Sequence, residues 1–504
     1  MQQEQGINFP LTGEDKRSTT VTAKRVLSEA LRAVDPRAAE DVEQEASWRK
    51  RYPRHYRRLV EAGLRSPEAA ERIAADGMRA LYKEMIFVRG QETLKIRDAM
   101  SGAMQTELHT AVVEGQDDSP PGELSIPYAG KRLSGDDLSR QIDNWEARGV
   151  FEPSCAEALR RVQANPEWLD LADQTVVLLG AGAEMGPFQV FNRWRANVVA
   201  VDLNRPPIWE RLIADARDGN GRLVFPLRSP FRPDLDDAGQ ASQAGADLIA
   251  ETPEIASWLA TLDSPLTVGG YAYLDGGQHV RVAMAMDAIM EHLSVQRSGT
   301  TLAFLATPSD IFAVPRDAAE MARQRFEERD AGKLWQESLR TLSGNRLFTS
   351  NITEMLPLAP DKETAIVDSL VVGQGPNYAL AKRLQRWRAT IARRQGIRVS
   401  SNVAPGTNTV SVVRNPTLAA AYAGAEYFGI EAFEVDTSNA LMATMLVHDL
   451  RHEGAAANPE VPLDHPAELF MQGAIHGGLW RVAFSPRSAM WFAALRGWRA
   501  SRRQ

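Results

Sequence analysis

The chain has 504 residues, of which 44% are hydrophobic and 24% charged, and its formal net charge is -7. This length exceeds the ~250–300 residues at which a single hydrophobic core usually stops growing, so we expect more than one domain. An acidic chain has no summed positive field to collect phosphates, which argues against nucleic-acid binding. We interpret the basic run at residues 47–58 as a solvated helix face or an interdomain contact.

Cysteine usage and hydropathy restrict the compartment. Cys155 is the only cysteine, so we expect neither an intrachain disulfide nor a cysteine-based zinc site. The first 20 residues lack the apolar segment of a secretory signal, and no run of about 18 uncharged apolar residues follows. We therefore expect a cytoplasmic protein without membrane contact. A peripheral contact through the apolar C-terminal stretch, residues 469–498, remains an alternative.

The first 166 residues predict a mainly helical N-terminal domain, to which the sequence assigns no role. Segments such as 22–34 and 66–87 carry apolar residues three and four positions apart, and Ser66 followed by Pro67 is typical of a helix start. A polar stretch at 113–135 indicates a linker or irregular loop, and two more helices are expected at 135–149 and 155–165.

Residues 167–445 predict an α/β fold with a Rossmann-like, doubly wound parallel sheet. Short apolar runs of strand length alternate with helical segments there. These predicted strands are residues 175–182, 197–203, 222–227, 246–251, 265–271, 300–307, 363–373 and 396–405. A charged helical insertion at 310–364 interrupts the alternation and is expected to cap a site. Residues 446–504 form a C-terminal extension, expected to cover a substrate site or an interface.

A glycine-rich turn follows the first of these strands. Gly180, Gly182 and Gly186 lie between a predicted strand and a predicted helix, where glycines allow a pyrophosphate to approach the backbone. Asp202 ends the next strand, at the position from which a carboxylate accepts hydrogen bonds from ribose hydroxyls. S-adenosylmethionine would use a similar loop and acid, so this half of the domain leaves the cofactor open.

The second half resembles the short-chain dehydrogenase/reductase family. The residues that carry the resemblance are Tyr378 and Lys382 at the start of a helix, then Gly396-Ile397-Arg398-Val399, and then Pro405-Gly406. It covers roughly residues 173–440 and implies a nicotinamide dinucleotide, NAD or NADP, held at the glycine loop, at Lys382 and beside Pro405 and Gly406. It further implies an oxidoreductase that interconverts a ketone and a secondary alcohol.

The resemblance also assigns catalytic roles. Tyr378 would be the general acid and base, and Lys382 would lower the pKa of its phenol and hold the nicotinamide ribose. Ser309 or Thr307 would orient the substrate oxygen, with Ser369 as a rival. The chain departs from the family pattern in having Phe188 as the last residue of the glycine motif and Gln278 or His279 near the family's helix asparagine.

The sequence gives less direct indications of the cofactor, the substrate and the partners. Asp202 favours NAD(H) because a carboxylate repels a 2'-phosphate, whereas Arg205 would soften that repulsion and admit NADP(H). The C-terminal aromatic residues enclose a bulky, apolar small-molecule substrate, or they belong to a packed core or an oligomer interface. They are Trp480, Phe484, Trp491, Phe492 and Trp498. A homo-oligomer is implied only by the resemblance.

Three alternatives stay open at this point. A protein that binds a dinucleotide without catalysis, in a regulatory or structural role, would need the same loop. An S-adenosylmethionine-dependent methyltransferase would leave Tyr378 and Lys382 without a function. His448 and His452, four residues apart, resemble half of a zinc motif, but Asp449 replaces its usual glutamate, so we expect a surface loop and no metal.

Overall fold

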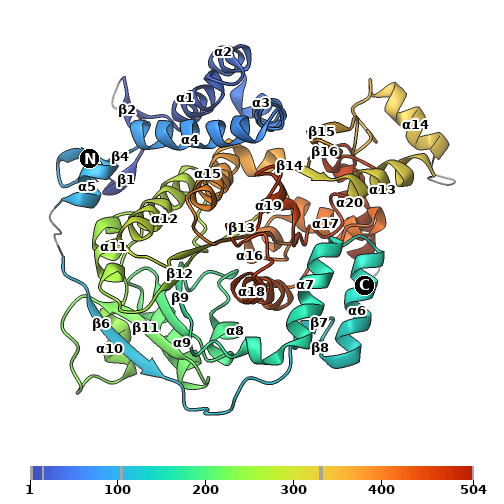
Figure 1. Ribbon diagram of the computed structural model, residues 1–504. Helices are drawn as coiled ribbons and strands as arrows, with labels where there is room; N and C mark the ends of the chain where they lie inside the picture. The colour runs from blue at the N-terminus through green and yellow to red at the C-terminus, as the bar shows by residue number, and fades with distance from the viewer. Residues whose placement is uncertain (1–3, 14–15, 103–105, 329–332, 502–504) are drawn as a thin grey trace.

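The computed structural model describes residues 4–13, 16–102, 106–328 and 333–501 (Figure 1). Outside these ranges lie residues 1–3, 14–15 and 103–105 of the predicted N-terminal domain, 329–332 of the predicted insertion and 502–504 of the predicted C-terminal extension. The described chain is a mixed α/β structure around a seven-stranded, mostly parallel sheet, as predicted.

The main sheet has the strand order β17-β13-β12-β9-β10-β11-β6, and β6 alone runs antiparallel, against β11. Its strands are β6 (His109–Glu114), β9 (Thr175–Leu179), β10 (Asn197–Val201), β11 (Arg222–Leu227), β12 (Leu266–Gly270), β13 (Thr301–Ala306) and β17 (Val399–Val403).

Each central strand is buried on both faces. Val177 and Leu179 of β9 belong to one hydrophobic core, whereas Val176 and Leu178 belong to the core on the opposite face. Successive side chains of a strand point to opposite faces, so a strand between two layers of helices needs an unbroken apolar run. This is why the apolar segments of the sequence predicted the strands well.

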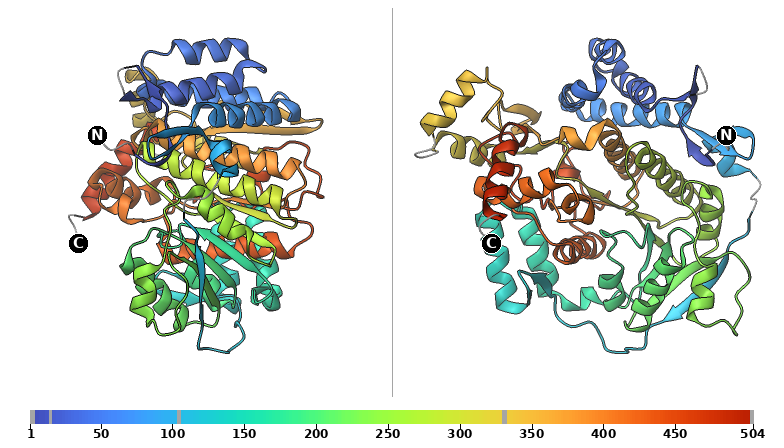
Figure 2. Two further views of the ribbon diagram at one scale, coloured as in Figure 1. Left: turned by 90° about the vertical axis from the view of Figure 1, so that its left-hand side faces the viewer. Right: turned by 180° about the vertical axis from the view of Figure 1, so that it is seen from behind.

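Helices cover both faces of the sheet (Figures 1 and 2). One layer consists of α11 (Thr252–Ala260), α12 (Gly277–Gln296) and α15 (Gly375–Arg394). The other consists of α8 (Phe188–Arg193), α9 (Pro206–Arg217) and α18 (Val435–Arg451), with α6 (Gly135–Ala147) and α7 (Pro153–Ala164) beyond it.

The predicted strand at 246–251 is wrong. Residues 246–251 form turns, because the Asp247 carboxylate accepts hydrogen bonds from the backbone N–H groups of Ile249 and Ala250, at 2.8 and 3.2 Å. This arrangement turns the chain toward the start of α11 and prevents an extended conformation.

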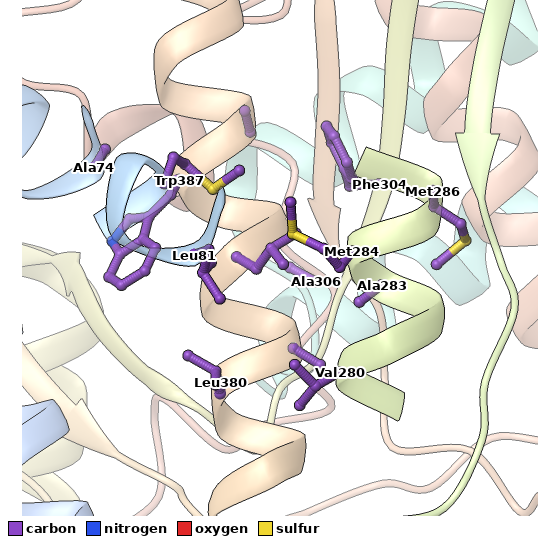
Figure 3. Packing of buried hydrophobic residues seen from close by; sticks show 14 of the residues in the cluster. Ala74, Leu81, Val280, Ala283, Met284, Met286, Phe304, Ala306, Leu380 and Trp387 are labelled. Atoms are coloured by element: carbon purple, nitrogen blue, oxygen red, sulfur yellow. The ribbon is translucent and has the colours of Figure 1, made fainter. Parts of the chain in front are cut away.

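The N-terminal segment packs on α15. Its helices are α1 (Thr19–Arg32), α2 (Pro36–Gln44), α3 (Trp48–Gly63), α4 (Pro67–Glu84) and α5 (Ile96–Ser101). Trp387 of α15 lies against α4 near Ala74 and Leu81 (Figure 3). A Cβ on Gly77 would be 2.5 Å from the Trp387 ring, so a glycine is needed there.

Short strands complete the segment before residue 166. They are β1 (Gly6–Asn8), β4 (Ile86–Arg89) and β5 (Glu92–Lys95), which form one sheet, and the pairs β2 (Leu11–Thr12) with β3 (Lys16–Arg17) and β7 (Ile126–Tyr128) with β8 (Lys131–Leu133). Because β6 also belongs to this segment and pairs with β11, the main sheet takes its edge strand from the region predicted as the N-terminal domain.

The insertion is not purely helical, which corrects the prediction. Its strands β14 (Ile311–Pro315), β15 (Leu356–Ala359) and β16 (Lys362–Asp368) form a separate antiparallel sheet in the order β14-β16-β15. The predicted parallel strand at 363–373 is therefore β16 of this small sheet. Helices α13 (Arg316–Glu327) and α14 (Lys333–Leu342) connect β14 to β15 and lie on the side of the molecule away from the N terminus (Figure 2).

The last part of the chain lies beside the carboxyl end of the sheet. It contains α16 (Val410–Val413), α17 (Pro416–Ala425), α19 (Glu468–Met471) and α20 (Pro486–Ser501). α17 and α20 touch through backbone, since a Cβ on Gly424 would be 1.9 Å from the Ala493 carbonyl oxygen. Among the described helices, none is both long enough and apolar enough to cross a membrane.

Candidate functional site

The candidate site lies where the parallel strands end. The glycine loop follows β9, Thr307 follows β13, and Pro405 and Gly406 follow β17. Since β9, β12, β13 and β17 are parallel and β12 and β13 lie between the outer two, their carboxyl ends meet at one edge of the sheet. Ligands of open α/β sheets bind in the crevice at this edge.

Helix α15 brings Tyr378 and Lys382 to this edge. The helix begins at Gly375, whose φ of +83° is accessible mainly to glycine, and Pro376 occupies its first turn. The Lys382 ammonium lies 6.0 Å from the centre of the Tyr378 ring, as expected for residues four apart on one helix face. It donates hydrogen bonds to the Leu305 carbonyl oxygen and to Oε1 of Gln385, at 3.2 and 3.3 Å.

The pKa of Tyr378 differs from the sequence-based expectation. Burial raises the pKa of its phenol well above the ordinary value, and a hydrogen bond with Thr307 offsets this only in part. Burial also lowers the pKa of the Lys382 ammonium to about 8, against an opposing effect of Asp310. Desolvation therefore dominates the pKa of Tyr378, and the side chain is a protonated phenol at neutral pH.

Of the three candidate hydroxyls, Thr307 is the partner of Tyr378. Its Oγ1 is also 2.9 Å from Oγ of Ser309, so the three side chains form a short chain of hydroxyl groups. Ser369 lies after β16, where its backbone N–H donates to the Asp310 carbonyl oxygen at 3.1 Å. The Oγ of Ser369 is buried and has no hydrogen-bond partner within the part of the chain that the structure describes.

His279 of α12 completes the site. Its imidazole stacks on the Tyr378 ring, and its Nδ1 accepts a weak hydrogen bond from the Leu274 N–H at 3.5 Å. Burial and, less strongly, the nearby Lys382 lower the pKa of His279 to about 3, so the ring is neutral. The sequence left Gln278 and His279 open. Gln278 bonds Arg281 instead, with 2.9 Å between Oε1 and Nη1.

Two further features were missed by the sequence analysis. Tyr273, in the loop after β12, lies edge-on to Tyr378 with ring centroids 6.2 Å apart. Asp310 forms buried ion pairs with Arg383 and Arg386 of α15, at 3.0 and 2.9 Å. These ion pairs tie the segment after β13 to the helix that carries Tyr378. No sequence motif indicated these ion pairs, because Asp310 is more than 70 residues away from both arginines in sequence.

The glycine loop and Asp202 lie together as predicted. Gly180 has a φ of +95°, and a Cβ there would be 2.5 Å from the Ala272 backbone nitrogen. The Asp202 carboxylate accepts hydrogen bonds from the backbone N–H groups of Gly182 and Leu203, both at 2.8 Å. Burial raises the pKa of Asp202 above its ordinary value despite these bonds. Gly186 closes the loop, with a backbone N–H that donates to the Ala183 carbonyl oxygen at 2.9 Å.

The fit of this edge to a dinucleotide is partial. Gly180 and Gly182 leave no room for side chains, and each Asp202 oxygen bonds one N–H and can accept further hydrogen bonds, as a ribose requires. Glu184, however, is part of the same loop, and its carboxylate oxygens lie 3.1 and 3.2 Å from the backbone nitrogen of Val410. A pyrophosphate between the loop and this nitrogen requires the Glu184 carboxylate to turn away.

Two cavities lie near the candidate site, and Tyr378 lines one of them. The first, which we call the tyrosine cleft, has a volume of about 410 Å³ and is lined by Tyr378, His279 and Tyr273 among others. The second, which we call the apolar cavity, has a volume of about 120 Å³ and is lined by Ser309, Ser369 and Gly406 together with mostly apolar side chains. Four residues line both cavities: Val371, Leu418, Ala421 and Met490.

The insertion and the C-terminal extension, both predicted to cover a site, contribute different numbers of residues to the walls of the two cavities. Val371, Gly373 and Gln374, which follow β16, line the cavities, whereas the described residues of α13 and α14 line neither. The C-terminal aromatic residues divide as well. Phe484 lines the apolar cavity and Trp491 lines the tyrosine cleft. Trp480 is fully buried against Phe312 and His476.

The pair His448 and His452 lies at the end of α18 rather than on a surface loop, which corrects the prediction. Their ring centroids are 5.1 Å apart, and the intervening Asp449 accepts hydrogen bonds from Ser400 and Asn402, both at 2.7 Å. Asp449 therefore anchors α18 to β17. Within the described ranges, no group of three or more histidine, cysteine or acidic side chains is placed to hold a metal ion.

Comparison with known proteins finds no match to this chain, whether with family models, curated proteins or solved structures.

Proposed function

We propose that this protein is an oxidoreductase of short-chain dehydrogenase/reductase type, which uses NAD or NADP to interconvert a ketone and a secondary alcohol. The observation that carries the proposal is the meeting of Tyr378, Lys382 and Thr307 at the carboxyl end of β13. Thr307 follows β13, whereas Tyr378 and Lys382 belong to α15, and Tyr378 lines a cavity of about 410 Å³.

The sheet supports this proposal. Counted along the chain from β9, its six parallel strands have the spatial order 3-2-1-4-5-6, which is typical of Rossmann-like dinucleotide-binding sheets. The glycine loop follows the first strand and Asp202 follows the second, as such sheets require. A methyltransferase would share the loop but would give no chemical role to a partly buried tyrosine next to a lysine.

In the proposed reaction, Tyr378 is the proton donor. A reduced nicotinamide, held by the glycine loop and Lys382, would supply the hydride chemistry. The Tyr378 phenol donates its proton to the carbonyl oxygen, and the resulting phenolate recovers a proton from solvent. Thr307 orients the substrate oxygen, and the Lys382 ammonium stabilises the phenolate and holds the nicotinamide ribose. The phenol is protonated at neutral pH, which is the form that can donate this proton.

The proposed cofactor is NAD(H) ahead of NADP(H). Asp202 presents a carboxylate at the end of β10, and this charge would repel a 2'-phosphate. Arg205, which lowers the pKa of Asp202, is the side chain that would soften the repulsion.

One observation favours a second candidate, a protein that binds a dinucleotide without catalysis. The Glu184 carboxylate accepts the hydrogen bond of the Val410 backbone N–H, which a pyrophosphate could otherwise accept. Such a protein would bind the cofactor weakly, and Tyr378 would have only a packing role.

Titration of the full chain with NADH, NADPH and S-adenosylmethionine tests the proposal. We expect enhanced nicotinamide fluorescence with NADH at lower concentrations than with NADPH, and oxidation of NADH when a ketone is added. Binding of S-adenosylmethionine alone would overturn the proposal. NADH binding without turnover over a panel of aliphatic and aromatic ketones would favour the non-catalytic candidate.

A further inference from the structure

The apolar cavity, which Ser309 lines, is closed by parts of the chain outside the main sheet. Val371 comes from the segment after β16, Ala425 from the end of α17, and Met490 from α20. Phe428 and Phe484 close its far end and lie edge-on to each other, with ring centroids 6.4 Å apart. The cavity therefore exists only because the insertion and the C-terminal extension pack against α17.

The polar groups at the wall of this cavity are almost all paired within the protein. Charged or titratable side chains there have partners elsewhere: Glu431 with Tyr128 at 2.7 Å, His476 with Glu152 at 2.8 Å, and Arg487 with Asp368. Ser309 is paired with Thr307 at 2.9 Å. What remains is the Oγ of Ser369, which is 1% exposed as a residue and has no partner among the described residues, and the phenol of Tyr422, which also lines the cavity.

A buried hydroxyl group without a hydrogen-bond partner, in an otherwise apolar wall, indicates that a ligand binds there. Leaving a buried hydroxyl without a hydrogen bond costs about 1–3 kcal/mol, so such groups usually meet a ligand or a water molecule. Apart from the paired groups named above, the wall consists of aliphatic and aromatic side chains, which do not favour a charged group. The ligand portion that fits is therefore apolar, with at most one uncharged polar atom near Ser369 or Tyr422.

The size of the cavity limits this portion. An apolar cavity of ~150 Å³ holds one benzene molecule, so a cavity of about 120 Å³ accommodates about five carbon atoms. Val371, Leu418, Ala421 and Met490 form the wall common to this cavity and the tyrosine cleft, in which the reacting carbonyl would meet Tyr378.

We infer that the apolar cavity is a binding site for one uncharged substituent of the substrate ketone, an alkyl chain of about five carbons or a small ring. This inference rests on the proposed function for the location of the carbonyl group. The remainder of the substrate lies in the larger, more polar tyrosine cleft. The substrate class is then a ketone with one short apolar arm, and a charged group on that arm is excluded.

The experiment uses methyl ketones from butan-2-one to dodecan-2-one as probes of the full chain without cofactor. Their dissociation constants are measured by ligand-observed NMR titration, which does not depend on turnover. Burial of each methylene contributes about a threefold to fourfold gain in affinity. We expect this gain up to heptan-2-one or octan-2-one and less than a twofold gain for each methylene beyond.

A filled cavity provides the decisive variant. Ala425 lines the apolar cavity but not the tyrosine cleft, and an Ala425→Phe side chain would occupy most of the space. We expect this variant to lose the chain-length dependence and to bind octan-2-one at least tenfold more weakly. The control is Ala423→Phe, because Ala423 is exposed on the same helix and lines neither cavity. It should bind the series as the unmodified protein does.

The outcomes separate this inference from the proposed function. The inference is overturned if the affinity for the methyl ketones does not depend on chain length, or if it keeps rising at the same rate up to dodecan-2-one. This holds whether or not the protein oxidises NADH. An unchanged series in a folded Ala425→Phe variant overturns it too. If Ala425→Phe does not fold, the chain-length limit in the unmodified protein still decides. A correct chain-length limit without any turnover leaves the cavity assignment in place and overturns only the oxidoreductase proposal.

Discussion

The imidazole of His279 lies almost parallel to the phenol ring of Tyr378, with ring centroids 5.4 Å apart and 18° between the ring planes. The two residues come from neighbouring helices, α12 and α15, which pack against each other on one face of the sheet (Figure 3). A ring held in this way has little freedom to rotate, so the phenol oxygen stays close to Thr307.

Replacing His279 tests whether stacking positions the phenol. His279→Ala should lower kcat for ketone reduction about 10- to 100-fold, because a displacement of ~1 Å at a reacting group can cost as much as 10² in rate. His279→Phe preserves a flat ring and should recover most of kcat. Steady-state kinetics of both variants provide the measurement. If His279→Phe is as slow as His279→Ala, the ring nitrogens matter and the stacking explanation is wrong.

Tyr378→Phe removes the proposed proton donor and leaves the ring in place. General acid catalysis typically contributes about 10²–10⁴ in rate, so kcat should fall by this factor while the dissociation constant for NADH changes less than twofold. Kinetics and a fluorescence titration of the same preparation measure the two effects. A variant that retains more than a tenth of the activity would show that Tyr378 is only a packing residue.

Lys382 should give NADH binding a defined pH dependence. Burial lowers the pKa of its ammonium to about 8, so the side chain is charged below this pH and neutral above it. The affinity for NADH should therefore fall as the pH rises through about 8 and level off above it. Lys382→Gln should bind weakly, with no step between pH 6.5 and 9.5. A flat profile for the unmodified protein would contradict a role of the ammonium in cofactor binding.

Glu184 should oppose cofactor binding. Its carboxylate contacts the Val410 N–H from within the glycine loop, and it repels a pyrophosphate placed there. An exposed charge pair is worth up to ~1 kcal/mol, so Glu184→Gln should tighten NADH binding about two- to fivefold at low ionic strength. Glu92→Gln makes the same change in net charge on β5, far from the loop, and serves as the control. Equal or weaker binding by Glu184→Gln would refute this view of the loop.

Arg388 should matter more for stability than an exposed arginine. It donates two hydrogen bonds to the Asp287 carboxylate, at 2.7 and 2.9 Å, and the side chains are only 7% and 1% exposed. Arg388→Ala leaves that carboxylate buried without its cation, which should lower the free energy of unfolding by about 3–5 kcal/mol. Arg316→Ala breaks the exposed pair with Glu320 and should cost less than about 1 kcal/mol. Urea unfolding compares the two variants, and similar losses would contradict the burial argument.

The sequence by itself determined the parallel strands of the main sheet and the positions of the residues at their ends. A strand buried on both faces needs a continuous apolar run, so residues 175–179 and 301–306 could be recognised without partners. The pairing of Tyr378 with Lys382 follows from helix geometry alone, because residues four apart share a face. The contact between the glycine loop and Asp202 follows from the strand-turn-helix-strand order.

Segments whose local signal is ambiguous needed tertiary structure. Residues 362–368 have the composition of a buried parallel strand, yet they pair antiparallel with β14 outside the main sheet. Residues 246–251 are apolar enough for a strand, but the Asp247 side chain bonds the backbone and turns the chain. Edge strand β6 could not be assigned to the sheet from its own sequence, because its partner β11 begins more than 100 residues later.

Tertiary structure alone also decided the chemistry of the candidate site. Sequence reasoning favoured Thr307 or Ser309 with Ser369 as a rival, whereas packing brings Thr307 to the phenol and places Ser369 in the wall of the apolar cavity. The sequence indicated that Lys382 would lower the pKa of Tyr378. In the folded chain the phenol is enclosed, and desolvation raises that pKa instead. Spacing along a helix can be read from the order of residues, but the exclusion of water depends on what other segments pack around them.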